Sequence, residues 1–171
     1  MQEIYVKNLV EVLKNRARLQ KQLNVKITNK GKNVFIDGKP ENEFLALEVL
    51  KAINLGFSAE KALQLKNEEV ILQSINIKDI TNRRDIEQVR ARIIGTRGKT
   101  LKTLKTLTEC DFSLCNNQIG IIGDAEEIED AVQALTSLIQ GSKQGNVYSR
   151  LERERKKKKL KNRNMGFFER N

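Results

Sequence analysis

The chain carries two copies of one sequence pattern, and this internal repeat restricts its possible folds more than any other feature. A chain of 171 residues has room for two domains of roughly 80 residues each. Shifting the sequence by 85 positions aligns, among other identical pairs, Gly38 with Gly123, Glu41 with Glu126, Ala46 with Ala131, Leu50 with Leu135, and Gly56 with Gly141. The repeat therefore predicts two small domains of the same fold.

Each copy contains the pattern of a β-hairpin. Apolar residues alternate over 25–28 and form a short run over 33–38, and the second copy repeats this at 110–114 and 118–123. This spacing predicts paired strands, with the hairpin loop at residues 29–32 in the first copy and at 116–117 in the second.

A helix is expected after each hairpin. The first starts at Pro40, and its apolar positions are Phe44, Leu47, Leu50 and Leu55. The second starts at Asp124, with apolar positions at Ile128, Val132, Leu135 and Ile139. Gly56 and Gly141 follow these helices, where a left-handed C-cap is expected.

Further elements are expected before each hairpin. The first copy has a helical stretch over 9–23, and the second has a strand over 70–77 with helices over about 85–94 and 101–107. The resulting order is strand, helix, turn, helix, strand, strand, helix, which predicts an α+β fold present twice.

The turn between the two helices of the second copy contains the most specific motif. It reads Gly95-Thr96-Arg97-Gly98-Lys99 and follows Arg92-Ile-Ile. Two glycines three apart let the backbone approach a ligand closely, and the N-terminus of the next helix favours a phosphate oxygen. The first copy has no such glycine pair and reads Val-Glu-Val-Leu over 10–13.

In this setting the motif resembles the Gly-x-x-Gly loop of eukaryotic-type (type I) KH domains, which clamps about four single-stranded nucleotides. The resemblance implies two tandem KH domains packed together, each a three-stranded sheet with helices on one face. The expected boundaries are 1–66 for a degenerate first domain, 67–148 for the second, and 149–171 for a basic C-terminal helix and tail.

The resemblance also implies the RNA-binding residues. They are the loop Gly95, Thr96, Arg97, Gly98 and Lys99, an apolar groove of Ile94, Leu101 and Phe112, and a phosphate track of Arg92, Lys102 and Lys105.

Four segments narrow the resemblance to the archaeal relatives of the partner-of-Nob family of small-subunit assembly factors. They are 56–63, 75–79, 92–100 and 145–152, although Ala59 stands where a proline is usual. Membership implies binding of single-stranded RNA near the 3′ end of small-subunit ribosomal RNA. It also implies contacts to the 3′-end endonuclease, to the dimethyladenosine methyltransferase and, in archaeal members, to the alpha subunit of initiation factor two.

The basic residues are concentrated, and this favours a polyanionic partner. The net charge is +10, and residues 141–171 hold eleven Lys or Arg against three Glu. We expect this segment to add electrostatic affinity for RNA. The accessory basic residues are Arg153, Arg155, Lys156, Lys157, Lys158 and Lys159.

Composition argues against catalysis. The chain has no His and only two Cys, so a His-based triad, a His-ligated metal and a four-thiolate zinc site are excluded. We expect no enzyme activity, no cofactor and no metal, and the lack of an export signal or a long apolar run predicts a cytoplasmic protein. Two alternatives stay open: a non-specific single-strand binder or RNA chaperone, and an adaptor that mainly contacts proteins.

Overall fold

The computed structural model describes residues 1–168 and divides the chain into two compact units. The first unit comprises Met1–Asn76 together with Asp111–Ala125, and the second comprises Ile77–Cys110 together with the chain from Glu126 onward. These units do not coincide with the three segments expected from the sequence. The expected domain boundaries therefore stay a prediction.

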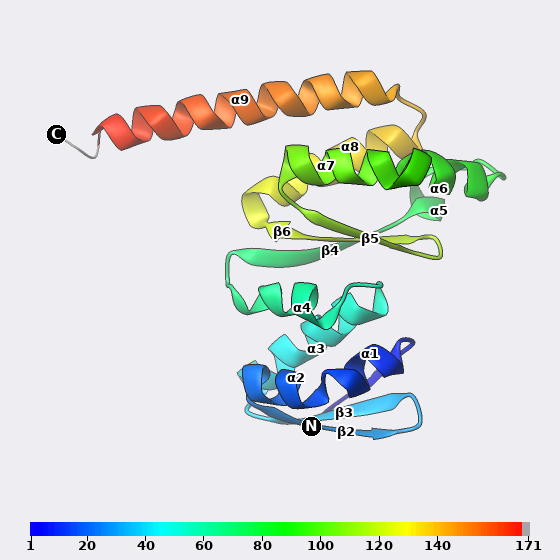
Figure 1. Ribbon diagram of the computed structural model, residues 1–171, viewed down its shortest axis with the longest axis vertical. Coiled ribbons are helices and arrows are strands. Elements are labelled where there is room, and N and C mark those ends of the chain that lie inside the picture. The colour runs from blue at the N-terminus through cyan, green and yellow to red at the C-terminus, as the bar shows by residue number, and fades with distance from the viewer. Residues whose placement is uncertain (169–171) are drawn as a thin grey trace. The chain divides into compact units, whose positions relative to one another are not determined.

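The first unit begins with a three-stranded antiparallel sheet and three helices (Figure 1). The strands pair in the order β1-β3-β2. The elements are β1 (Gln2–Tyr5), α1 (Leu9–Lys14), α2 (Arg16–Leu23), β2 (Val25–Lys30), β3 (Asn33–Gly38) and α3 (Pro40–Asn54).

One face of this sheet forms the core, as the alternating pattern predicts. Val25 and Ile27 of β2 are buried while the residues between and after them are exposed, and Ile27 pairs with the buried Ile36 of β3. Leu19 of α2 and Leu50 of α3 belong to the same buried cluster. The helices therefore cover one face of the sheet.

A second antiparallel sheet repeats this strand order. It follows a short helix α4 (Ala59–Ala62) and a 3-10 turn η1 (Leu63–Lys66), and it pairs in the order β4-β6-β5. Its strands are β4 (Val70–Asn76), β5 (Asp111–Cys115) and β6 (Gln118–Asp124). The shared order, and the turn at 116–117, confirm the repeat expected from the sequence.

The segment after α3 approaches β6 closely at one glycine. A Cβ built on Gly120 would lie 2.7 Å from Cε2 of Phe57 and 3.1 Å from Cβ of Leu55. Ile122, on the same strand, joins the cluster that contains both apolar residues. Only a glycine at this position leaves room for the two side chains.

The second unit contains the remaining helices. They are α5 (Ile77–Ile80), α6 (Ile86–Ile94), the 3-10 turn η2 (Thr96–Gly98), α7 (Lys99–Thr108), α8 (Ala125–Ile139) and α9 (Gln144–Phe168). Helices α7 and α9 lie side by side (Figure 1). Within residues 1–168, no helix combines the length and apolar character needed to cross a bilayer.

The helical stretch expected over 9–23 is helical except at Asn15, where α1 ends before α2 begins. The side-chain amide of Asn15 donates to the carbonyl and carboxylate oxygens of Glu11. An asparagine that bonds to the preceding turn in this way competes with helix continuation.

Phe44 does not belong to the core, because its side chain is 66% exposed. The buried face of α3 runs through Glu43, Ala46, Leu50 and Ile53 instead. The Glu43 carboxylate accepts hydrogen bonds from the Met1 ammonium and the Gly38 N–H, and these bonds hold its pKa below the ordinary value. The hydrogen-bonded Glu43 carboxylate therefore lies on the buried face of α3, and the neighbouring Phe44 side chain faces solvent.

Candidate nucleic-acid interface

The backbone of the loop between α6 and α7 adopts positive φ angles at both of its glycines. Gly95 has φ 74° and ψ 175°, Arg97 has φ 56° and ψ 30°, and Gly98 has φ 73° and ψ 15°. The conformation of Gly95 is essentially restricted to glycine, whereas that of Gly98 is left-handed helical. The two glycines therefore fix the loop, and Thr96 and Arg97 between them are exposed.

The two glycines have different surroundings. A Cβ on Gly95 would clash with Oγ1 of Thr100 and lie 2.8 Å from its backbone nitrogen, whereas a Cβ on Gly98 would meet no described atom within 4 Å. Gly95 thus permits the internal packing of the loop against α7. Gly98 leaves open space on the outer side, where a ligand backbone could approach.

This difference predicts unequal costs for two alanine substitutions. Gly98→Ala should lower the free energy of unfolding by about 1 kcal/mol, the cost of a left-handed residue with a Cβ. Gly95→Ala should cost roughly 2 kcal/mol or more, because it adds a steric clash to a forbidden conformation. Urea denaturation of both variants measures this, and equal costs would contradict the described packing of Gly95.

The start of α7 presents positive charge. Among the described residues, no side chain caps this helix at Gly98, and the positive end of the helix dipole lies here. The N–H groups of Gly98 and Lys99 donate to the carbonyls of Gly95 and Thr96 within the loop. Lys99 and Arg97 are exposed at the same place. The arrangement suits a phosphate group.

A pocket of about 400 Å³ adjoins this loop. The sequence motif includes four of its lining residues: Arg92, Gly95, Thr96 and Lys99. Sequence reasoning missed the other five, which are Ala91, Thr100, Thr103, Gln144 and Tyr148. The last two come from α9, and the only signal for them is the segment 145–152, which contains Tyr148.

The other predicted RNA-binding residues lie outside this pocket. Ile94 and Leu101 are half-buried at the end of α6 and the start of α7, and Phe112 is half-buried on β5, where it pairs with Ile121. Lys102 and Lys105 are exposed on successive turns of α7. The groove and the phosphate track that these residues would form stay predictions.

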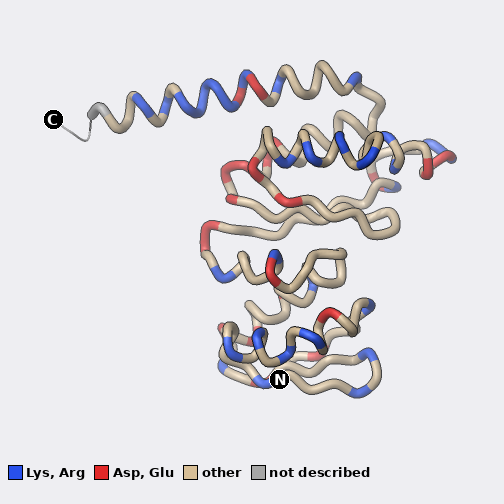
Figure 2. The backbone as a smooth tube through the Cα atoms, viewed as in Figure 1, with Lys and Arg blue, Asp and Glu red and all other residues tan. Residues whose placement is uncertain are grey.

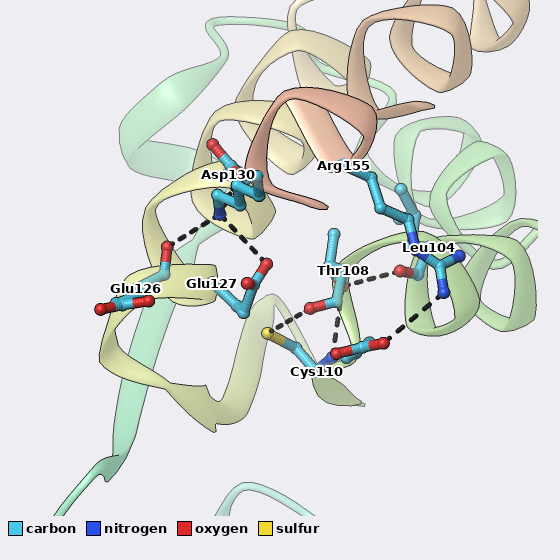
Figure 3. A network of polar contacts seen from close by, with 9 residues as sticks. Leu104, Thr108, Cys110, Glu126, Glu127, Asp130 and Arg155 are labelled. Atoms are coloured by element: carbon cyan, nitrogen blue, oxygen red, sulfur yellow. Dashed lines mark hydrogen bonds and ion pairs between the residues drawn. The ribbon is translucent and has the colours of Figure 1, made fainter. Parts of the chain in front are cut away.

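Two of the six accessory basic residues make contacts to other helices or turns of the protein. Arg155 donates to the Thr106 carbonyl at 3.3 Å and pairs with Glu109 at 3.5 Å. The Lys158 ammonium lies 2.7 Å from Asp130 and 3.2 Å from Glu127. Figure 3 labels these two acidic residues together with Arg155.

These contacts affect the charge that α9 offers to a ligand. Burial alone would lower the pKa of Lys158, but its hydrogen bonds to Asp130 and Glu127 outweigh burial, so its pKa lies above the ordinary value. Lys157 pairs with Glu154 of the same helix at 3.5 Å. Arg153, Lys156 and Lys159 provide further positive charge, and the basic residues follow one another along α9 (Figure 2).

Apolar anchors complete the attachment of α9. Val147 and Leu151 are buried one turn apart, and the next turns place Arg155 and Lys158 on the same side of the helix. The α9 helix is thus held along its first four turns. No group of three or more Cys, Asp or Glu side chains placed to bind a metal occurs in the described part of the chain.

The comparisons with known proteins agree with this geometry. Residues 71–156 match the family model of the eukaryotic-type KH domain (KH-domain type I), in the form of the second KH domain of PNO1 proteins. A KH domain-containing protein of Methanocaldococcus jannaschii is 34% identical over 113 residues, which are 66% of this chain and 50% of that protein. The RNA-binding protein pno1 of Drosophila melanogaster is 30% identical over 138 residues, which are 76% of this chain and 58% of that protein. The chain thus spans 50–58% of the length of these relatives.

Solved structures extend the similarity to nearly the whole chain. Dim2p from Pyrococcus horikoshii is 32% identical with a TM-score of 0.81, covering 90% of this chain and 99% of that one. A chain from the a/eIF2alpha-aDim2p-rRNA complex of the same organism is 31% identical with a TM-score of 0.83, covering 91% of this chain and 94% of that one. On the family match, the repeated sheet and the Gly95–Gly98 loop, this chain belongs to the eukaryotic-type (type I) KH-domain family, in its PNO1 form.

Proposed function

We propose that the chain is an RNA-binding factor in pre-rRNA processing, which binds single-stranded RNA near the 3′ end of small-subunit ribosomal RNA. The observation that carries the proposal is the open Gly95–Gly98 loop ahead of the N-terminus of α7. Two lines of similarity support it. The relatives include the pre-rRNA-processing protein PNO1 of Debaryomyces hansenii, and the Pyrococcus complex contains rRNA.

In this proposal the loop holds the RNA backbone. Gly98 leaves space for a sugar-phosphate to approach, the positive end of the α7 dipole favours phosphate oxygens, and Arg97 and Lys99 add charge-assisted contacts. A KH domain clamps about four nucleotides in this way. Lys102 and Lys105 would extend the contact along α7.

The partners are also proposals. The Pyrococcus complex joins aDim2p to a/eIF2alpha, which favours the alpha subunit of initiation factor two as a partner of this chain. The proposal that the 3′-end endonuclease and the dimethyladenosine methyltransferase are partners rests on the family resemblance alone. The first copy lacks a Gly-x-x-Gly loop, so we assign protein contacts to it.

The cations of α9 should strengthen binding to every RNA equally. We expect the triple variant Arg153→Gln, Lys156→Gln and Lys159→Gln to lower affinity without changing sequence preference. If all three contact phosphates, the slope of log K against log salt should become shallower by about 2, at roughly 0.7 per contact on single strands. A salt series of binding titrations measures the slope.

The control for this variant replaces three exposed lysines of the first hairpin, Lys26, Lys30 and Lys32, with glutamine. It changes the charge equally and should alter the slope less. If the α9 variant lost its preference between RNAs, the assignment of specificity to the loop would be wrong.

A binding comparison tests the proposed function itself. Fluorescence anisotropy at fixed physiological salt compares a 3′-end oligonucleotide of small-subunit ribosomal RNA with a scrambled version. We expect the 3′-end sequence to bind at least tenfold more tightly, a difference of about 1.4 kcal/mol. Equal affinities would leave a non-specific single-strand binder and overturn the proposed binding near the 3′ end.

A further inference from the structure

The first turns of α9 contribute residues to the pocket beside the Gly95–Gly98 loop. The proposed binding of the RNA backbone by this loop does not use these residues. Gln144 and Tyr148 lie one helical turn apart and both line the pocket. A loop that only clamps phosphates does not need an aromatic ring from a helix about 50 residues away in the sequence.

Hydrogen bonds and buried residues hold the turns of α9 around Tyr148 in place. The side-chain amide of Gln144 donates to Oγ1 of Thr100 at 3.1 Å and to the Arg92 carbonyl at 3.4 Å. Val147 and Leu151 are buried on either side of Tyr148 in the sequence, at 2% and 4% exposure. The part of α9 that carries Tyr148 is therefore attached to the same helices that carry the loop.

The lining has the chemistry of a nucleotide site. Among the described residues that line the pocket, none is acidic, and Arg92 and Lys99 are basic. Within residues 1–168, no hydrogen bond or ion pair engages the Lys99 ammonium or the Tyr148 hydroxyl. The pocket thus offers an aromatic side chain, a cation and the hydroxyl group of Thr96, whereas the Thr103 hydroxyl donates to the Lys99 carbonyl at 2.9 Å.

We propose that this pocket is a subsite for one nucleotide of the bound RNA, with its base stacked on Tyr148 and its phosphate near Lys99. The inference rests on the proposed function, because the nucleotide would be a neighbour of those that the loop clamps. The pocket volume of about 400 Å³ falls in the range of small-molecule sites. Stacking on an aromatic side chain stabilises single-stranded nucleic acid whatever the base.

A cycle that combines base removal with side-chain removal tests the stacking. Each base of the 3′-end oligonucleotide is replaced in turn by an abasic site, and affinities are measured for the wild type, Tyr148→Ala and Tyr148→Phe. We expect one position at which base loss weakens wild-type binding about tenfold but weakens Tyr148→Ala less than about twofold. Tyr148→Phe keeps the ring and should behave as the wild type.

The dependence of the base-loss effect on Tyr148 distinguishes stacking from a purely structural role of this residue. If Tyr148 only held α9 in place, Tyr148→Ala would weaken the intact and all abasic oligonucleotides by the same factor, and the subsite would be overturned.

Tyrosine fluorescence provides a second readout that leaves Tyr148 intact. The chain has no Trp and two Tyr, and the other one, Tyr5, is 56% exposed on β1. Tyr5→Phe therefore leaves Tyr148 as the sole tyrosine emitter, while Tyr148→Phe leaves Tyr5 and corrects for absorption by the RNA. We expect RNA to quench the tyrosine fluorescence of Tyr5→Phe and not that of Tyr148→Phe.

The outcomes distinguish the subsite from the proposed function. Normal 3′-end binding with unquenched Tyr148 and no coupled position overturns the subsite and leaves the proposed function standing. Failure of the wild type to prefer the 3′-end RNA overturns the proposed function, whereas quenching and one coupled position would still support the subsite, because stacking does not depend on the base. A 3′-end preference together with quenching and one coupled position supports both.

Discussion

The double variant Thr96→Asp with Arg97→Asp should lose specific RNA binding while the fold survives. Both side chains are exposed between the two glycines of the loop, so neither supports the core. The change removes a cation and places two carboxylates where phosphates would bind. Loss of one charged hydrogen bond alone costs about 1.5–3 kcal/mol, and repulsion adds to it. We expect affinity for the 3′-end RNA to fall by about 100-fold.

Anisotropy titration measures this loss, and circular dichroism with urea unfolding checks the fold. The control variant is Thr28→Asp with Lys32→Asp, which makes the same charge change at exposed positions of the first hairpin. If the control lost as much affinity as the loop variant, overall charge rather than the loop would explain binding. Unchanged affinity in the loop variant would remove the loop from the RNA site.

Gly120→Val should destabilise the fold more than either alanine substitution in the loop. Its Cβ would lie 2.7 Å from the Phe57 ring and 3.1 Å from Leu55, and both side chains are buried. Overpacking of this kind costs about 1–3 kcal/mol, and a β-branched residue belongs at the upper end because it has few rotamers with which to avoid the contact. Equilibrium urea unfolding gives the free energy directly.

Ser74→Val is the matched control. Ser74 pairs with Gly120 across β4 and β6 and is exposed, so the same side chain there should change stability by less than about 0.5 kcal/mol. Equal stabilities of the two variants would contradict the close approach of Phe57 to the sheet.

The features that depend on local pattern could be predicted from the sequence. Alternation located the hairpin strands, and the glycine pair located the loop between α6 and α7, because a residue's immediate neighbours determine strand periodicity and positive φ. The repeat then implied that both sheets share one strand order, which the β1-β3-β2 and β4-β6-β5 pairings confirm.

Features that depend on distant contacts could not be predicted. The exposure of Phe44 follows from the hydrogen bond between Glu43 and the Gly38 N–H, which apolar periodicity does not register. The place of Tyr148 in the pocket depends on Gln144 reaching the helices that carry the loop. The pairing of Lys158 with two acidic side chains of α8 could not be predicted either, because the sequence of a lysine run does not show which lysine faces a neighbouring helix.

A photo-crosslinking map is the most direct test of the proposed RNA site. The 3′-end oligonucleotide, with 4-thiouridine in place of uridine, is irradiated with the wild-type chain, and the modified peptides are identified by mass spectrometry. We expect crosslinks concentrated in residues 92–105, around the Gly95–Gly98 loop, and their loss in the Thr96→Asp, Arg97→Asp variant. Crosslinks confined to the first copy, within residues 1–66, would contradict the site.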